Sequence, residues 1–125
     1  MLNVRRQPPL DYGKCCQTVT IYRQEAPGQY SRRVFHRAFL EYRRRVDIGK
    51  TGSAGESTFL LVIPGEEVPV RPGDKVFPGE GPEIATREEW AAFIPARVPG
   101  LVVVGYVEPK YWQGKLCHTE AGDSK

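Results

Sequence analysis

The stretch VFHRAFLEYRRRV at residues 34–46, followed by the glycine-rich GKTGSAG at 49–55 and the apolar FLLVI at 59–63, decides how this chain folds. Successive side chains of an extended strand point to opposite faces. One face of the first stretch would carry Val34, His36, Ala38, Leu40 and Tyr42, and the other Phe35, Arg37, Phe39, Glu41 and Arg43. The pattern predicts two β-strands joined by a long flexible loop, the first carrying arginines and the second buried.

A helix is the alternative for the first stretch. Phe35, Phe39 and Tyr42 fall at i, i+4 and i+7, which is the spacing of one helical face. The segments on both sides have the composition of strands, so a strand is the preferred interpretation.

Strands are also predicted before and after this hairpin. Residues 17–23 are dominated by β-branched side chains that alternate between two faces, and Pro27-Gly28 forms the turn behind them. Further along, Pro72-Gly73-Asp74 is a turn that leads into a short strand at residues 75–77.

The last third of the chain is predicted to contain one short helix and two strands. Thr86 and Glu89 form a capping box at the start of a helix over residues 87–93. The apolar run at residues 100–107 is expected to be the strongest strand and to lie at the centre of the sheet. Residues 108–115 are then expected to turn the chain, and residues 116–120 to form the last strand.

Composition agrees with a small, mainly β domain. The 125 residues include 13 glycines and 11 prolines, a density of turn formers that suits many short strands. The expected architecture is a small β-barrel or β-sandwich of about six strands with a long hairpin loop and one short helix. Residues 17–120 form this single domain, residues 1–16 a loose basic arm, and residues 121–125 a disordered polar tail.

Targeting signals are not evident. No apolar run is long enough for a transmembrane helix, and residues 1–9 lack the apolar core of a signal peptide. The sequence therefore predicts a cytosolic location and no membrane partner.

Charge is unevenly distributed along the chain. Residues 1–50 hold 11 basic and 4 acidic groups, a net charge of +7, whereas residues 51–125 hold 7 basic and 11 acidic groups, a net charge of −4. Such polarity indicates either a polyanionic partner or head-to-tail stacking of copies. A mixed, solvated surface is the alternative.

The candidate contact site is Arg43-Arg44-Arg45 together with Lys50, because planar guanidinium groups bind phosphate oxygens through two donors. The alternative is an exposed strand end. Flexibility of the loop would come from Gly49, Gly52 and Gly55. Gly49-Lys50-Thr51 is not a nucleotide-binding loop, because that motif needs a glycine where Arg44 stands.

Cysteines and histidines predict no metal, cofactor or catalytic site. Cys15, Cys16 and Cys117 have neither the spacing of a zinc site nor the even count of a disulfide framework, so reduced structural thiols are expected. His36 has no partner at a useful spacing, and the adjacent Cys117 and His118 would point to opposite faces of a strand. The chain is therefore not expected to be an enzyme.

The order of these features resembles the small proteins encoded in the head–tail gene clusters of tailed phages, namely the head-closure (stopper or head–tail joining) proteins and related minor capsid proteins. The resemblance covers residues 17–120. It is carried by the early strand at 18–22, the aromatic-basic strand at 34–37 with its long hairpin loop, Gly73-Asp74-Lys75-Val76 with Gly79-Glu80 behind it, Tyr111-Trp112 with Gly114, and the strand pair between Val103 and His118. The helix over 87–93 is a departure from the simplest joining proteins.

This resemblance implies a virion structural protein that is assembled in the host cytoplasm and forms a homo-oligomeric ring beneath the portal. Its partners would be portal or adaptor and tail connector proteins. The loop at 45–56 would point into the DNA channel, with Arg43, Arg44, Arg45 and Lys50 facing packaged DNA or a neighbouring subunit. A small basic β-barrel that binds nucleic acid by itself is the alternative, with Tyr30, Phe35 and Tyr42 as stacking platforms among the arginines.

Overall fold

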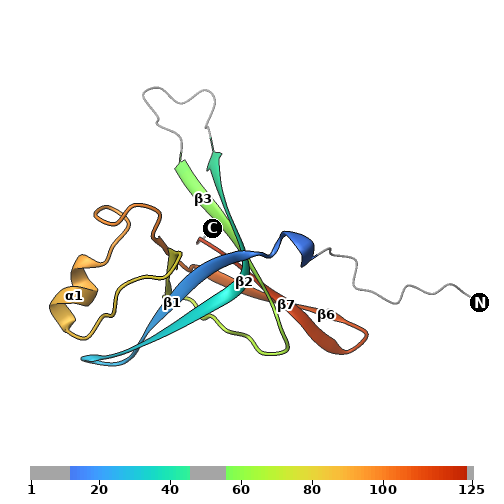
Figure 1. Cartoon of the computed structure of the whole chain (residues 1–125), viewed down its shortest axis with the longest axis horizontal. Helices are drawn as coiled ribbons and strands as arrows, with labels where there is room; N and C mark the ends of the chain where they lie inside the picture. The colour runs from blue at the N-terminus through green and yellow to red at the C-terminus, as the bar shows by residue number, and fades with distance from the viewer. Residues whose placement is uncertain (1–11, 46–55, 124–125) are drawn as a thin grey trace, which may run out of the picture.

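The computed structural model describes residues 12–45 and 56–123, which form one antiparallel seven-stranded sheet with a single short α-helix (Figure 1). The elements are η1 (Tyr12–Lys14, a 3₁₀ turn), β1 (Gln17–Ala26), β2 (Gln29–Arg45), β3 (Glu56–Pro64), β4 (Lys75–Pro78), α1 (Arg87–Ala92), β5 (Val102–Val103), β6 (Tyr106–Trp112) and β7 (Lys115–Gly122). The strand order is β5-β4-β1-β2-β3-β7-β6. The sheet curls into a half-barrel, so the predicted mainly β fold with one short helix is confirmed.

Strand β2 lies in the middle of the sheet, between β1 and β3. Its first part, residues 29–38, pairs with β1, and its second part, residues 39–45, pairs with β3. The strand prediction for this region is confirmed and the helical alternative is wrong. A two-residue period prevails because Ala38 and Leu40 are buried on the inner face of the sheet, where neighbouring strands supply their packing partners.

The main core lies on the concave face of the curled sheet. The apolar run of β3 alternates as a strand should, with Phe59, Leu61 and Ile63 pointing inward. The buried residues of this cluster are Val19, Ile21, Ala38, Leu40, Phe59, Leu61, Ile63, Val70, Val76, Val104 and Ala121. Each large side chain buried in this way contributes roughly 1.5–3 kcal/mol to folding.

Helix α1 and the loops around it cover the outer face of β1 and β4. Here Tyr22, Phe93 and Leu101 form a second buried cluster, against which Trp90 and Phe77 pack. The capping box is present as predicted, because the Glu89 amide donates to the Thr86 hydroxyl at 3.0 Å and the Glu89 carboxylate accepts from the Thr86 amide at 3.1 Å.

The prediction of a central strand at residues 100–107 is wrong. Only Val102 and Val103 form a strand there, at one edge of the sheet, and β6 begins at Tyr106 on the opposite edge. The two residues between them join the edges: the Val104 amide donates to the Asp74 carbonyl at 2.9 Å, and the Gly105 amide to the Gly122 carbonyl at 2.7 Å. An apolar run indicates that its residues are buried, but not where in the sheet they lie. Here Val104 is buried at the point where the two edges of the curled sheet meet, not in a central strand.

The prediction of a turn over residues 108–115 is also wrong. Strand β6 continues to Trp112, and the hairpin turn is confined to Gln113 and Gly114, which both have positive φ, at 53° and 81°. Two positive φ values match the right-handed twist of the flanking strands. Pro109 does not prevent the strand, because β6 is an edge strand.

The last strand is longer than expected. β7 ends at Gly122, so Ala121 and Gly122 are buried sheet residues rather than part of a polar tail. A Cβ on Gly122 would lie 2.6 Å from the Tyr106 ring, so a larger residue here would force that ring to shift. Residues 124–125 lie outside the described residues.

Candidate functional site

The β2–β3 hairpin extends past the rest of the sheet (Figure 1). Its two strands remain paired to the ends that the structure describes, with Arg43 opposite Thr58, Arg44 opposite Ser57 and Arg45 opposite Glu56. Three consecutive arginines therefore occupy the part of β2 farthest from the core, on backbone that is held in a regular ladder.

Among the predicted contact residues, the structure describes the side chain of Arg43. The Arg43 side chain is 60% exposed and donates to Glu41 Oε1 through Nε at 3.1 Å and through a terminal nitrogen at 2.9 Å. A solvent-exposed pair of this kind is weak, so Arg43 stays available to another anion. Of Arg44 and Arg45 the structure describes the backbone alone, and Lys50, Gly49, Gly52 and Gly55 lie outside the described residues.

The root of the hairpin is tied to the body of the protein. The Tyr42 hydroxyl donates to the Gly100 carbonyl at 2.6 Å, and the Leu40 amide donates to the Gln17 side-chain oxygen at 2.8 Å. Burial raises the pKa of Tyr42, because it disfavours the phenolate. These contacts fix the direction in which the arginines are presented.

One group of exposed carboxylates lies away from the hairpin, whereas Glu41 lies on β2 and binds Arg43. Exposed carboxylates surround α1 and the loop that follows β3, at Glu66, Glu67, Glu80, Glu83, Glu88 and Glu89. In Figure 1, α1 and the far end of the hairpin lie in separate parts of the molecule. The charge asymmetry of the sequence is thus also an asymmetry in space.

The outer face of β2, β3 and β7 bears a groove of about 330 Å³, called here the η1 groove. Its floor consists of Phe39, Leu60 and Val62, and one side is closed by η1 and the residue after it. The residues that line it are Tyr12, Lys14, Cys15, Phe39, Glu41, Arg43, Leu60, Val62 and Glu120. Within the predicted loose arm, residues 12–16 are therefore docked on the sheet, with Cys15 buried.

A hydrogen-bonded chain of three side chains anchors η1. The Tyr12 hydroxyl lies 2.7 Å from Nδ1 of the buried His118, and His118 Nε2 lies 3.0 Å from Glu120 Oε2. With the ring proton on Nε2, His118 donates to Glu120 and its Nδ1 accepts from the Tyr12 hydroxyl. Burial, followed by the proximity of Cys117, raises the pKa of Tyr12.

Sequence reasoning missed this anchor. The sequence pattern drew attention to the adjacent pair Cys117 and His118. The hydrogen-bond partners of His118 are instead Glu120, two residues further along β7, and Tyr12, 106 residues earlier in the chain. The only local signal was that His118 and Glu120 share one face of a strand.

Removing the hydroxyl in Tyr12→Phe is expected to loosen η1, because His118 Nδ1 would be left buried without a donor at a cost of about 1–3 kcal/mol. Hydrogen exchange should show faster exchange at the Cys15 amide, which donates to the Tyr12 carbonyl. The matched control is Tyr111→Phe, whose side chain is exposed. Equal exchange at Cys15 in wild type and Tyr12→Phe would contradict the anchor.

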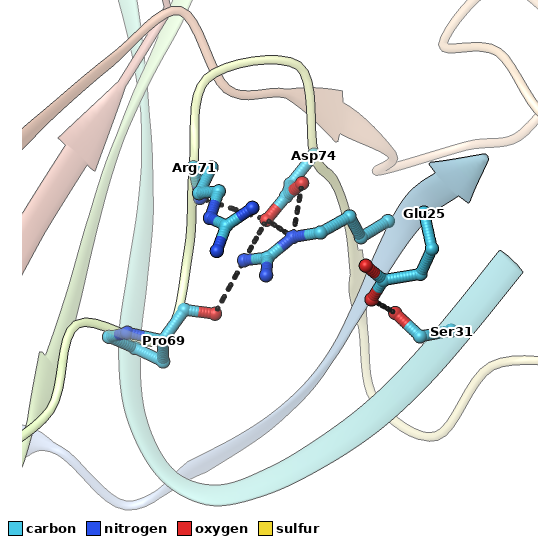
Figure 2. Close-up of polar contacts among 6 residues, drawn as sticks. Glu25, Ser31, Pro69, Arg71 and Asp74 are labelled. Atoms are coloured by element: carbon cyan, nitrogen blue, oxygen red, sulfur yellow. Dashed lines mark hydrogen bonds and ion pairs between the residues drawn. The ribbon is translucent and has the colours of Figure 1, made fainter.

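Three charged side chains outside the hairpin are structural. Arg23 on β1 binds the buried Asp74 through Nε and a terminal nitrogen, and Asp74 also accepts from the Arg71 amide at 2.9 Å (Figure 2). The hydrogen bonds with Asp74 raise the pKa of Arg23. Lys75 is 7% exposed, donates to the Trp90 and Phe93 carbonyls, and lies 4.0 Å from the centre of the Trp90 ring.

Within residues 12–45 and 56–123, no three His, Cys, Asp or Glu side chains are arranged so that they could hold a metal ion. No helix in this part of the chain has the length and apolarity needed to cross a membrane. Comparison of the chain with protein families, curated proteins and solved structures finds no match to any of them.

Proposed function

We propose that this protein is a virion structural protein of a tailed-phage head–tail connector, of the head-closure or stopper type. In this role it forms a homo-oligomeric ring beneath the portal, contacts portal or adaptor and tail connector proteins, and catalyses no reaction. It is assembled in the host cytoplasm and retained in the virion. The β2–β3 hairpin faces the DNA channel.

The observation that carries this proposal is the rooted hairpin with three arginines at its far end. Tyr42 and Leu40 fix its base to the body, so its position in a ring would be the same in every copy. The described residues that suggested the resemblance lie on β1 and β2, on β4 and directly before and after it, and between Val103 of β5 and His118 of β7. A small sheet domain that presents one basic projection is suited to line a channel filled with polyanion.

Charge also supports contact between copies. A basic hairpin on one copy and the carboxylates around α1 on the next are complementary and lie on different parts of the surface. Such a heterologous contact closes into a ring when the rotation between copies permits.

The test is the mass of the purified protein and its incorporation into connector particles. We expect native mass spectrometry to show a closed oligomer, alone or on a portal complex, and electron microscopy to show a ring. A protein that stays monomeric at all concentrations and does not join portal particles would remove the basis of the proposal.

Replacing Arg43, Arg44 and Arg45 with alanine tests the role of the hairpin. Each phosphate contact that is lost lowers the magnitude of the slope of log K against log salt by roughly one. DNA binding by the oligomer should therefore become weaker and less dependent on salt. The matched control is Arg37→Ala with Arg97→Ala, which removes two exposed arginines outside the hairpin. Equal DNA binding by the triple variant and the wild type would contradict a hairpin directed at DNA.

A nucleic-acid-binding β-barrel remains the second candidate. Two observations favour it. The Arg33 guanidinium lies 4.9 Å from the centre of the Phe35 ring, which places a cation beside an aromatic ring, and the Tyr42 side chain is 47% exposed. Tyr30, by contrast, is stacked on Trp90 with ring centres 5.0 Å apart. Salt-dependent binding of single-stranded DNA by a monomer would favour this candidate over the ring.

A further inference from the structure

We propose that the η1 groove of one copy is the docking site for residues 1–11 of a second copy. The inference rests on the self-association in the proposed function and identifies the surfaces that would make it. It is independent of whether the hairpin binds DNA.

The groove is apolar where a solvent-facing sheet surface is usually polar. Val62 is 6% exposed and Phe39 and Leu60 are half-buried, all three on the outer face of β2 and β3. Cys15 covers one side of this floor. The opposite side, toward the end of the hairpin, is bounded by the exposed side chain of Arg43.

Two carboxylates on the rim keep one acceptor oxygen each for a partner. Glu41 binds Arg43 through Oε1, and Glu120 binds His118 through Oε2. The second oxygen of each has no hydrogen-bond partner among the residues that the structure describes. A ligand with an apolar side chain for the floor and a cation for the rim fits this arrangement.

Residues 1–11 have this chemistry. Leu2, Val4 and Leu10 are apolar, and Arg5 and Arg6 supply the cations. Pro8-Pro9 favours an extended path, which lowers the entropy lost when the segment docks. Fully extended, 11 residues span about 36 Å, enough to reach a neighbouring molecule.

The direction of the chain favours a second copy over the chain's own segment. Tyr12 is bound over β7 through His118, Cys15 lies in the groove, and Gln17 begins β1 opposite Ala38 of β2. The described chain thus crosses the outer face from β7 toward β2, and its first residue, Tyr12, lies on the β7 side. To fill its own groove, the chain would have to reverse direction at Tyr12, the residue that His118 holds.

The experiment uses two full-length variants. In the segment variant, Leu2, Val4 and Leu10 are replaced by aspartate, and in the groove variant Leu60→Arg places a cation on the floor. Native mass spectrometry should show an oligomer for the wild type and a monomer for each variant alone. An equimolar mixture should form a complex, because the groove variant still has its segment and the segment variant still has its groove. Val103→Arg, on a half-exposed edge position, is the matched control and should assemble.

A synthetic peptide of residues 1–11 separates this inference from the ring. It should bind the segment variant, and adding Leu60→Arg to that variant should weaken the binding at least about tenfold. Circular dichroism confirms that the variants are folded. A ring that persists in both variants, with no peptide binding, overturns the inference and leaves the proposed function standing. A monomeric wild type whose peptide binds only the segment variant means that the chain fills its own groove, which overturns docking between copies.

Discussion

Replacing Asp74 with asparagine is expected to lower the free energy of unfolding by about 2–4 kcal/mol, because it breaks a largely buried ion pair. The Asp74 side chain is 4% exposed and that of Arg23 is 19% exposed, so the pair is shielded from water without being fully dry. Asparagine keeps the shape but leaves the Arg23 guanidinium without its counterion. The loop before β4 would lose the ion pair to β1 and keep the weaker bond from Arg23 to the Pro69 carbonyl at 3.5 Å (Figure 2).

Urea unfolding followed by fluorescence measures this loss. The matched control is Glu25→Gln on the same strand, whose carboxylate accepts a hydrogen bond from Ser31 at an exposed site. Its effect should stay below about 0.5 kcal/mol. In Asp74→Asn, the further change Arg23→Met should restore part of the stability, because the unpaired charge is removed. If the two substitutions are additive, the ion pair does not act as described.

Replacing Lys75 with methionine is expected to lower stability by about 2–3 kcal/mol. The Lys75 ammonium donates to the Trp90 and Phe93 carbonyls at 2.8 and 2.7 Å, at the C-terminal end of α1, where a cation is favoured by the helix dipole. It also lies over the face of the Trp90 ring. Methionine retains the apolar stem and removes all three interactions, so α1 should separate from the sheet more readily. The control is Lys110→Met, which removes an exposed ammonium.

The effect of Lys75→Met should grow with pH. Burial lowers the pKa of Lys75 from its ordinary value of 10.5, because it disfavours the ammonium. Between the folded-state pKa and 10.5 the unfolded chain binds more protons than the folded one, so stability from this group rises as pH increases. The variant lacks this contribution. Unfolding curves at pH values from 7 toward 10.5 should therefore diverge, and parallel curves would show that Lys75 titrates normally.

Several features of the fold could be predicted because their signals are local. The capping box of Thr86 and Glu89, the Pro27-Gly28 turn and the alternation in β1, β2 and β3 all involve residues within a few positions of one another. The candidate basic residues could be named for the same reason, because three arginines are adjacent in the sequence. The sequence could not predict the direction in which the hairpin holds these arginines. That direction depends on the hydrogen bond from Tyr42 to Gly100, 58 residues away.

The failures share a different cause. The run at 100–107 is apolar, and whether such a run pairs on both sides or joins two edges depends on strands that are distant in the chain. The edge strand β6 was mistaken for a turn because Pro109 and Gly114 are turn formers, yet an edge tolerates a proline. Tyr12 and His118 gave no pattern at all, since 106 residues separate them.

By itself, therefore, the amino-acid sequence determined that this chain forms a small β domain with a basic hairpin and one capped helix. The tertiary structure decided the curl that joins the two edges at Val104 and Gly105, the docking of η1 over β7, and the apolar groove beside it. The physical reason is that backbone conformation follows from neighbours along the chain, whereas strand pairing and burial follow from neighbours in space.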